Sequence, residues 1–345
     1  MKCLLLLFIA SSFGVAAAQW DDQTPPDQVP IHLPANYDPD VSTPVIIFLH
    51  GYNPFTTGWS DWLIALNDDA YDRGYIFVNP TGSQDSVGEF YWNATDACCD
   101  MFDSHNDHVG YLLALVDSIK ENYNVDPRRI HVVGYSNGGF MAHRLACDAP
   151  EVFASLISIA GAMWQDESNC QPSEPVHVLE IHGNWDAVIF WLGGYLGLDL
   201  VEYPSSTSTM QFWAQHNSCS TSPSDAGSFD FEWWIWFDET TRWIYENCED
   251  PSAGSAELWE INTGSHFPVM SDEGIDHLFD YMETHLNQEH LPCTADLDGN
   301  DSVNVNDLLI VIDNWDGNDP NADINNDGTV NIGDLLEVIS AWGDC

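Results

Sequence analysis

Strand-like and helix-like segments alternate along most of the chain, from about residue 30 to residue 291. Residues 44–50 read Pro-Val-Ile-Ile-Phe-Leu-His, a short apolar run typical of a strand buried on both faces. Residues 107–123 instead place apolar side chains at helical spacing. Further strands are expected at 75–79, 129–133, 155–160, 176–181 and 256–261, and further helices at 140–147 and 275–286. This alternation predicts an α/β fold, with helices on both faces of a mostly parallel sheet.

The segment Gly134-Tyr-Ser-Asn-Gly138 lies between the expected strand 129–133 and the expected helix 140–147. A G-x-S-x-G motif is a weak signal by itself, since a glycine-rich structural turn can have the same letters. Its position between a strand and a helix is the context that a nucleophile elbow requires. We therefore expect Ser136 to be a nucleophile, with the backbone N–H of Asn137 as one donor of an oxyanion hole.

A serine nucleophile needs a general base and an acid that orients this base. Asp186 follows the expected strand 176–181, and His266 follows the expected strand 256–261. Catalytic groups collect at such strand ends in open α/β sheets. The alternatives are a solvated loop aspartate and a surface histidine. His182 is a weaker candidate for the base, because it precedes the acid along the chain.

A second oxyanion donor is expected from the loop that follows the strand 45–49, which reads His50-Gly51-Tyr52. Gly51 would let the backbone approach a substrate closely. We expect Gly51 or Tyr52 to supply the donor. For His50 itself, packing and hydrogen bonding are favoured over a part in proton transfer.

Several longer motifs resemble the polyhydroxybutyrate depolymerase-like esterases, a group that also resembles feruloyl and acetylxylan esterases. They are Ile31-His-Leu-Pro-Ala-Asn-Tyr37, Phe48-Leu-His-Gly51, Trp92-Asn-Ala94 with Cys98-Cys99, Tyr123-Asn-Val-Asp-Pro127, Gly134-Tyr-Ser-Asn-Gly-Gly-Phe-Met-Ala-His-Arg-Leu-Ala-Cys147, and Ile181-His-Gly183 with Asp186. The resemblance covers about residues 28–290 and is most specific around Ser136. It implies an α/β-hydrolase fold and carboxylic ester hydrolysis through an acyl-enzyme. Ser136, Asp186 and His266 would be the catalytic residues.

The chain departs from this group around the acid. Residues 188–191 read Val-Ile-Phe-Trp, where the group has a sequence closer to Val-Ile-Pro-Tyr. Trp185 and Trp191 flank Asp186 and are expected to form a substrate wall. Residues 233–243 add four further tryptophans, which could form a platform for a polymer or an aromatic acyl group, or could simply pack in the core. These departures leave the acyl group open.

Two copies of an Asp/Asn-rich loop followed by an apolar helix occur 27 residues apart, after about residue 292. Oxygen-bearing residues recur at the loop positions from which calcium is bound in a 12-residue loop. The expected ligands are Asp296, Asp298, Asn300, Ser302, Asn304 and Asp307 in the first loop, and Asp323, Asn325, Asp327, Thr329, Asn331 and Asp334 in the second. The alternative is a pair of Asn/Asp-rich turns that bind no metal.

The duplicated pattern resembles a type I dockerin, a small all-α module. The resemblance implies two Ca²⁺ ions and docking to a cohesin or to a cell-surface scaffold. Many dockerins carry Ser-Thr at the positions that contact the cohesin. Here these positions hold Val305-Asn306 and Ile332-Gly333, which leaves cohesin binding open.

The chain carries 55 acidic and 7 basic residues, a net charge of −48. Acidity this strong argues against nucleic acid or an anionic membrane as a partner. Residues 293–345 hold 12 acids and no Lys or Arg. The rest of the chain is therefore strongly acidic by itself. Calcium-binding loops do not explain its charge, which favours a saline habitat as the explanation.

Residues 1–18 read as a signal peptide, with an apolar core that is too short to span a bilayer. We thus expect an exported protein with an esterase domain at 19–291 and the dockerin-like module at 292–345. Eight cysteines remain after cleavage, an even number that suits disulfides. Cys219 is expected to pair with Cys248 and Cys293 with Cys345, while Cys98, Cys99, Cys147 and Cys170 pair among themselves.

The sequence as a whole predicts a secreted serine esterase that acts on polymeric or polymer-derived esters. The acyl group could be feruloyl, acetyl or hydroxyalkanoyl, or could belong to another polyester, including an aromatic one. No cofactor is expected for catalysis. A catalytically inactive binding module attached to a scaffold and a peptidase of the same fold are the alternatives.

Overall fold

The computed structural model describes residues 23–53, 66–196, 201–287, 295–298, 302–325 and 327–344. The expected signal peptide at 1–18, the expected calcium ligand Asn300, and the cysteines Cys293 and Cys345 lie outside the described residues. The expected boundary between the two domains, at 291–292, also lies outside them.

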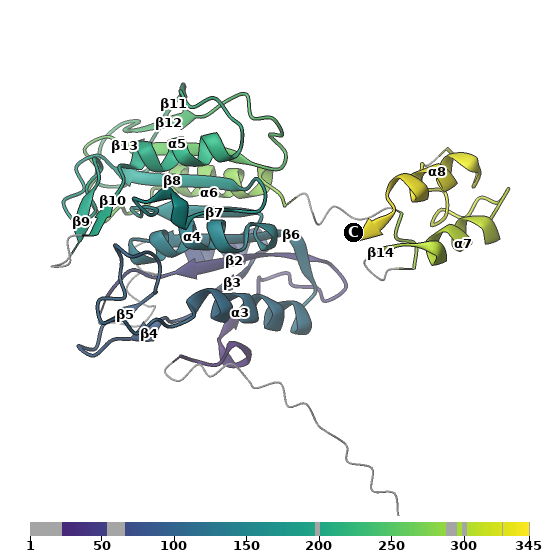
Figure 1. Ribbon diagram of the computed structural model, residues 1–345, viewed down its shortest axis with the longest axis horizontal. Coiled ribbons are helices and arrows are strands. Elements are labelled where there is room, and N and C mark those ends of the chain that lie inside the picture. Colours follow the sequence, from purple (N-terminus) through teal and green to yellow (C-terminus); the bar gives the residue numbers. More distant parts are fainter. Residues whose placement is uncertain are drawn as a thin grey trace, which may run out of the picture.

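A nine-stranded sheet forms the centre of the fold, in the order β1-β3-β2-β6-β7-β8-β13-β12-β11 (Figure 1). The six strands from β3 to β13 run parallel, and β1, β12 and β11 are antiparallel at the two edges. The bounds are β1 Ile31–His32, β2 Thr43–Leu49, β3 Ile76–Val78, β6 Val125–Tyr135, β7 Ser155–Ile159, β8 His177–Gly183, β11 Ser224–Phe229, β12 Thr240–Ile244 and β13 Ser255–Ile261.

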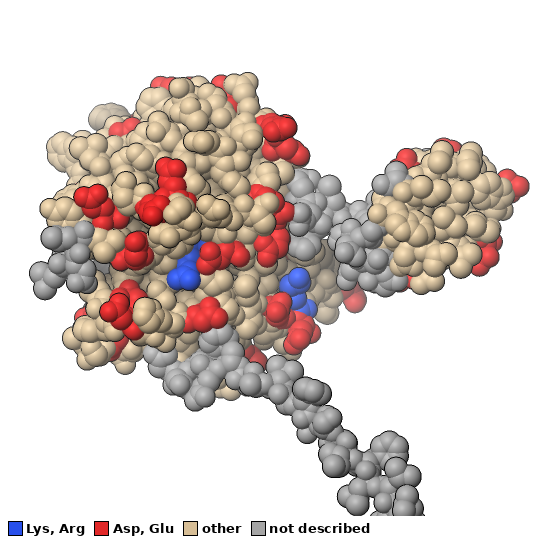
Figure 2. Space-filling view, viewed as in Figure 1, with Lys and Arg blue, Asp and Glu red and all other residues tan. Residues whose placement is uncertain are grey.

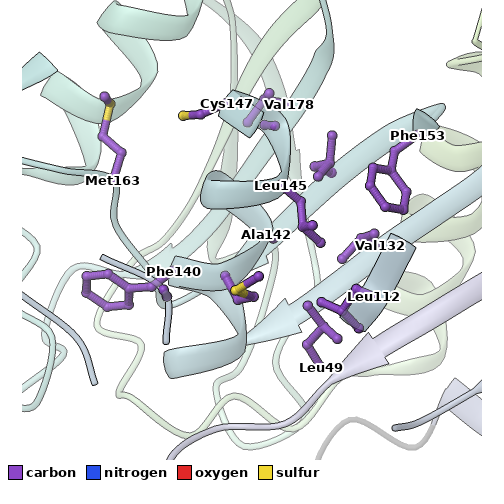
Figure 3. Packing of buried hydrophobic residues seen from close by; sticks show 14 of the residues in the cluster. Leu49, Leu112, Val132, Phe140, Ala142, Leu145, Cys147, Phe153, Met163 and Val178 are labelled. Carbon is purple, nitrogen blue, oxygen red and sulfur yellow. The ribbon is translucent and has the colours of Figure 1, made fainter. Parts of the chain in front are cut away.

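Alternate residues of the buried strands feed two separate apolar layers. In β2, Val45 and Ile47 pack on one face while Ile46 and Phe48 pack on the other. The first face is covered by α3 (His108–Asn122), α4 (Asn137–Asp148) and α5 (Ser206–His216), and the second by α2 (Leu66–Arg73) and α6 (Asp272–Thr284). Figure 3 shows Phe140, Ala142 and Leu145 of α4 among the side chains of the first layer.

The smaller elements complete the described part of the chain. They are the 3-10 helices η1 Pro26–Gln28, η2 Pro150–Val152 and η3 Glu167–Asn169, the strand pairs β4 Ser83–Gln84 with β5 Phe90–Tyr91, β9 Gly194–Leu196 with β10 Val201–Tyr203, and β14 Ser302–Val303 with β15 Gly343–Asp344, and the helices α7 Val305–Asp313 and α8 Ile332–Ser340. Helices α7 and α8 share an apolar cluster of their own that includes Val311 and Val338. Each of these two helices begins with a capping box, formed by Asn304 with Asp307 and by Asn331 with Asp334.

The strands and helices expected from apolar spacing are all present, and the mostly parallel α/β fold is confirmed. Helix α5 and the antiparallel strands β11 and β12 were not expected. Strand β11 reads Ser-Asp-Ala-Gly-Ser-Phe and is mostly exposed, so that it lacks the apolar run that marks a buried strand.

The expected pairing of Cys219 with Cys248 is confirmed, and the four earlier cysteines do pair among themselves, as Cys98–Cys99 and Cys147–Cys170. No helix among the described residues is long and apolar enough to cross a membrane. On the face shown in Figure 2, acidic side chains are widely spread and basic ones are few.

Candidate active site

Ser136 lies in the sharp turn between strand β6 and helix α4. Its backbone φ is 54°, a left-handed conformation that is uncommon for a residue other than glycine. The turn is tight enough that a Cβ on Gly134 would lie 2.0 Å from the carbonyl oxygen of Gly138. A Cβ on Gly138 would lie 2.0 Å from the carbonyl oxygen of Leu49. Both glycines are therefore required, and the turn presents the Ser136 side chain at the start of α4.

Asp186 lies in the turn that follows β8. Its own N–H donates to the Gly183 carbonyl at 3.0 Å. Its Oδ1 accepts hydrogen bonds from the backbone N–H groups of Val188, at 2.7 Å, and Ile189, at 2.9 Å. Although burial opposes the charge, hydrogen bonds from His182 and His266 hold the pKa of Asp186 well below its usual range. The carboxylate is thus fixed in one orientation and stays ionised.

His266 joins the other two side chains. It follows the end of β13 at Ile261, and its backbone carbonyl accepts a hydrogen bond from the Tyr135 hydroxyl at 2.9 Å. Its Nδ1 lies 2.7 Å from Asp186 Oδ2, and its Nε2 lies 3.0 Å from Ser136 Oγ. The three residues expected from the sequence therefore form a continuous chain of hydrogen bonds, in which an imidazole can take a proton from a serine hydroxyl. His182, the weaker candidate for the base, lies instead against Glu180 and Asp186.

The residues expected around the oxyanion lie next to Ser136. Asn137 is the first residue of α4, and the first N–H groups of a helix have no partner within that helix. The Asn137 side chain is bound to the backbone N–H and carbonyl of Trp92. On the opposite loop, a Cβ at Gly51 would lie 3.2 Å from the Ser136 Cβ. The backbone of this loop thus lies directly beside Ser136, and a role for Gly51 or Tyr52 as oxyanion donor stays a prediction.

His50 is a buried structural histidine. Burial lowers its pKa to about 4, so that the ring is neutral at ordinary pH. Its Nε2 accepts from the N–H of Gly82 at 2.9 Å, and its Nδ1 lies 2.7 Å from the Gly51 carbonyl. Because an N–H on Nδ1 can then donate to this carbonyl, His50 holds the Gly51 loop in place.

A pocket of about 210 Å³ opens beside Ser136. It is lined by Gly51, Tyr52, Asn53, Cys98, Cys99, Met101, Tyr135, Ser136, Val188, Ile189, Leu196, His266 and Phe267. The sequence did not predict that the Cys98–Cys99 disulfide and Met101 would line this pocket. The only signal in the sequence was that Cys98 and Cys99 are adjacent. A larger cavity of about 490 Å³, around β9 and β10, contains none of the three catalytic candidates.

The expected substrate wall is not part of this pocket lining. Trp185 is 71% exposed, and its N–H donates to the Gly264 carbonyl near His266. Trp191 is half-buried, and its ring lies edge-on to His182 with the ring centres 5.9 Å apart. A wall role for Trp185 and Trp191 stays a prediction.

An exposed aromatic loop lies at the same edge of the sheet as the site. Gly183 pairs with Ile261, Ile261 with Thr240, and Thr240 with Phe229, so that this row of residues marks one end of four strands. The connection from β11 to β12 carries Trp233, Trp234, Trp236 and Phe237, which are 62%, 69%, 84% and 86% exposed. This segment, residues 230–239, is called the aromatic loop below. Trp243 lies outside it, in β12, where its indole donates to Glu260.

The aromatic loop is bound to the segment that carries His266. The N–H of Trp233 donates to the Val269 carbonyl at 2.8 Å, and Glu232 forms an antiparallel bridge with Met270. The N–H of Asn262 donates to the Glu239 carbonyl at 3.0 Å. The exposed tryptophans therefore lie on a loop that is bonded to the residues on both sides of His266.

Carboxylates gather in the first of the two repeated loops. Ligand atoms of Asp296, Asp298 and Asp307 all lie within 4.8 Å of one another, in a stretch of sequence without Lys or Arg. Ca²⁺ prefers several oxygen ligands close together, and these carboxylates have no basic residue nearby in the sequence to neutralise them. The cluster therefore fits Ca²⁺. In the second loop, Asp323 accepts from the N–H groups of Asp327 and Gly328, and Asp334 from those of Asn325 and Asn331. Both loops thus fold around their aspartates.

A mostly parallel sheet with Ser, Asp and His placed in this order after three of its parallel strands is the arrangement of the α/β-hydrolase fold. Its serine turn, acid and base come from β6, β8 and β13. Consistent with this fold, the model of the Esterase family matches residues 26–236, and the chain belongs to this family.

Similar proteins include esterases and a depolymerase. Feruloyl esterase B of Piromyces equi is 26% identical over 253 residues, which cover 69% of this chain and 42% of the relative. Poly(3-hydroxyalkanoate) depolymerase C of Paucimonas lemoignei is 31% identical over 144 residues, 40% of this chain and 31% of the relative. The chain thus spans less than half the length of these curated relatives. An acetyl xylan esterase from Aspergillus awamori shares the fold, with a TM-score of 0.50 and 15% identity over 74% of this chain and 93% of that one.

Proposed function

We propose that the protein is a secreted serine esterase that cleaves ester bonds of polymers, or of their fragments, through an acyl-enzyme. The observation that carries the proposal is the hydrogen-bonded chain from Ser136 Oγ through His266 to Asp186, at 3.0 and 2.7 Å. The apolar run at residues 3–10 and the disulfides of the large domain support export to an oxidising compartment.

Acylation begins when His266 Nε2 takes the proton of the Ser136 hydroxyl as its oxygen attacks the ester carbonyl carbon. The C–O bond to the serine forms, and the carbonyl oxygen becomes an oxyanion. The N–H of Asn137 and an N–H from Gly51 or Tyr52 stabilise this oxyanion. The ester C–O bond then breaks, and His266 gives its proton to the departing alcohol oxygen.

Deacylation repeats these steps with water. His266 takes a proton from a water molecule, whose oxygen attacks the acyl carbon. The bond to Ser136 Oγ breaks, and the serine recovers its proton from His266. The ionised Asp186 stabilises the imidazolium that forms in both halves of the reaction.

Two features support a polymeric substrate. The pocket beside Ser136 is small and lined largely by apolar side chains, which suits a short acyl unit. The aromatic loop adds four exposed aromatic side chains beside the segment that carries His266, where a longer chain can lie. The relatives named as a feruloyl esterase and a polyhydroxyalkanoate depolymerase fit this substrate class, either as ester-bearing polysaccharide or as polyester.

The two repeated loops support a dockerin-like module with two Ca²⁺ ions. Asp296, Asp298 and Asp307 would bind the first ion, together with Asn300, Ser302 and Asn304. Asp323, Asn325, Asp327, Thr329, Asn331 and Asp334 would bind the second. Calcium there would stabilise the fold of the module rather than take part in ester cleavage. A cohesin or a cell-surface scaffold is the proposed partner.

Hydrolysis of p-nitrophenyl acetate by the wild type and Ser136→Ala tests the proposed function. We expect kcat/KM to fall by roughly 10⁴-fold or more, since loss of the nucleophile removes the acyl-enzyme route. Ser168→Ala, at an exposed serine in η3, is the matched control and should leave kcat/KM unchanged. Equal rates for the wild type and Ser136→Ala would instead favour a non-catalytic binding module.

A panel of substrates separates the remaining alternatives. Feruloylated and acetylated polysaccharides, polyhydroxybutyrate, an aromatic polyester and a set of peptides would be assayed at high salt. We expect one ester class to be cleaved at least tenfold faster than the others. Cleavage of peptides at rates equal to those of esters would exclude the esterase proposal.

A further inference from the structure

A second series of buried hydrogen-bonded groups starts at Asp186, on the side away from His266. It runs through His182 and Glu180 to His143 and Trp213. His182 Nε2 lies 2.9 Å from the Ile189 carbonyl and 3.4 Å from Asp186 Oδ2. His182 Nδ1 lies 2.8 Å from Glu180 Oε1. His182 and Glu180 are both on β8, and both are almost completely buried. A histidine and a carboxylate are thus enclosed directly beside the catalytic acid.

The indole N–H of Trp213 shows which ring nitrogen of His143 carries a proton. An indole nitrogen can only donate, and Trp213 Nε1 lies 3.1 Å from His143 Nδ1, which must therefore accept. The remaining ring nitrogen of His143, Nε2, carries the proton and donates to Glu180 Oε2 at 3.1 Å. Glu180 is consequently an acceptor at this oxygen.

His182 has a proton on both ring nitrogens. Its Nε2 faces a carbonyl and a carboxylate, which are both acceptors, so this nitrogen must carry a proton. A second proton lies in the hydrogen bond between His182 Nδ1 and Glu180 Oε1. We assign this proton to Nδ1, because the resulting imidazolium lies between two carboxylates, Glu180 and Asp186. Burial opposes this charge, but the hydrogen bonds and negative charges of Asp186 and Glu180 outweigh burial and raise the pKa of His182 to about 10.

We propose that His182 is a positioning residue, a permanently charged imidazolium that holds Asp186 in place and weakens the negative field that Asp186 exerts on His266. The inference rests on the proposed function, since it assigns Asp186 and His266 their catalytic roles. Glu180 balances the buried charge of His182, so that the pair is neutral overall but has its positive end toward Asp186. The negative charge that Asp186 presents to His266 is then smaller than that of an unshielded carboxylate.

The other groups that face this cluster are neutral. The Ser206 hydroxyl of α5 lies 2.9 Å from His182 Nδ1, and the Trp191 ring lies edge-on to the imidazole. Burial raises the pKa of Tyr203 in β10 and of Tyr135 in β6, and the charge of Asp186 raises both further. Glu180, Asp186 and the catalytic His266 are thus the groups whose ionisation His182 can influence.

The test is the pH dependence of kcat/KM for wild type, His182→Gln and the double variant Glu180→Gln/His182→Gln. Without the imidazolium, the full charge of Asp186 favours a protonated His266. The acidic limb of the profile should therefore move up by about one pH unit in His182→Gln. The double variant should move in the same direction by less, since it leaves no unpaired buried carboxylate. The loss should appear in kcat rather than KM, because His182 touches no substrate.

His177→Gln is the matched control. His177 is also a buried histidine of β8, bonded to Ser255 and to the Ser252 carbonyl, and it has no contact with Asp186. It should lower thermal stability without moving the acidic limb. An acidic limb that coincides in wild type, His177→Gln and His182→Gln would overturn the proposal and leave His182 as a residue of the folded core.

Nitrogen NMR on the wild-type enzyme with ¹⁵N-labelled histidine needs no variant. We expect one histidine whose two ring nitrogens remain protonated at pH 9. Finding no such histidine would refute the charged state even if the variants fail to fold. Because this readout needs no catalysis, a failure of this inference is distinguishable from an inactive wild type, which would count against the proposed function.

Discussion

At the scale of single residues, two buried carboxyl groups stand at the base of the aromatic loop. Glu239 Oε1 accepts hydrogen bonds from the N–H groups of Phe231 and Glu232 and from the Thr240 hydroxyl. Glu232 lies beside it, and its Oε2 has no hydrogen-bond partner within the described part of the chain. Burial, followed by the neighbouring charge of Glu239, raises the pKa of Glu232 to about 7. Glu232 is thus a buried acid that folding prefers in its neutral form.

Substitution Glu232→Gln should stabilise the protein at alkaline pH. Because the pKa of Glu232 is higher in the folded state than in the unfolded state, its contribution to the free energy of unfolding is complete below about pH 4.5. This contribution is lost as the pH rises toward 7, because the folded protein then holds a buried charge. Glutamine keeps the shape without the charge. We expect the Tm at pH 8 to rise by about 2–4 °C and the Tm at pH 4.5 to change little.

Thermal unfolding at both pH values measures this effect. Asp238→Asn is the matched control, since Asp238 is an exposed carboxylate of the same loop. Its Tm should follow that of the wild type at both pH values. An equal change for Glu232→Gln at pH 4.5 and pH 8 would contradict the assignment to ionisation.

The roles of individual residues could be predicted where they depend on position after a strand. Asp186 and His266 were expected because a polar residue follows each apolar run, and the structure brings both to Ser136. His182 follows the expected strand 176–181 and was a weaker candidate for the base, whereas Glu180 lies within that strand and gave no such signal. Only the folded chain places Glu180 beside His182 and His143, and His143 beside Trp213.

At the scale of elements, the aromatic loop connects two edge strands that contribute none of the three catalytic candidates. Its three tryptophans and Phe237 are largely exposed, although burying an aromatic side chain is normally favourable. Its backbone is nevertheless fixed by bonds to the residues 262–270. An apolar surface that is exposed yet rigidly held is typical of a binding site.

Replacing Trp233, Trp234 and Trp236 together by serine should separate polymer binding from catalysis. We expect adsorption to an insoluble ester polymer to fall at least tenfold, since each lost side chain removes an apolar contact worth about 1–2 kcal/mol. Hydrolysis of p-nitrophenyl acetate should stay within about twofold of the wild type, because none of the three tryptophans lines the pocket beside Ser136.

The control for this variant replaces Tyr71, Trp315 and Trp342 by serine, three exposed aromatic residues outside the aromatic loop. Adsorption in a pull-down assay should match that of the wild type. If both triple variants lose adsorption equally, general surface hydrophobicity rather than the aromatic loop governs binding.

The elements that could not be predicted share a physical cause. Strands β11 and β12 are at the edge of the sheet and are half exposed, and α5 begins with Ser-Thr-Ser-Thr. Their formation depends on pairing with β13 and on packing against the rest of the sheet. The central strands are buried on both faces, so they can be predicted from their continuous apolar runs.

At the scale of the whole molecule, charge is the dominant feature. A net charge of −48 in 345 residues destabilises the compact state through repulsion between carboxylates. Dissolved salt screens this repulsion over about 10 Å at 0.1 M and over a shorter distance at higher concentration. The proposed saline habitat would supply such screening.

Added sodium chloride should therefore raise the Tm at pH 7.5, by about 5 °C or more between roughly 0.05 and 2 M. The same titration at pH 4 is the control, since many carboxylates are protonated there and the rise should be smaller. Equal rises at the two pH values would point to a general effect of salt on burial.

Calcium removal should affect the two parts of the molecule differently. We expect EDTA to unfold the C-terminal module, which has its own apolar cluster around Val311 and Val338, and to leave most p-nitrophenyl acetate hydrolysis intact. Limited proteolysis with and without EDTA, followed by an activity assay, measures both effects. Complete loss of activity would mean that calcium also supports the esterase domain.

The placement of the aromatic loop has a consequence for engineering. Its two ends continue into the edge strands β11 and β12, while Ser136, Asp186 and His266 follow β6, β8 and β13. Residues 233–237 could thus be exchanged for another surface sequence, with Glu232 and Glu239 retained as anchors. Under the proposed function, exchanging these residues would change adhesion to a polymer and leave the residues around Ser136 in place.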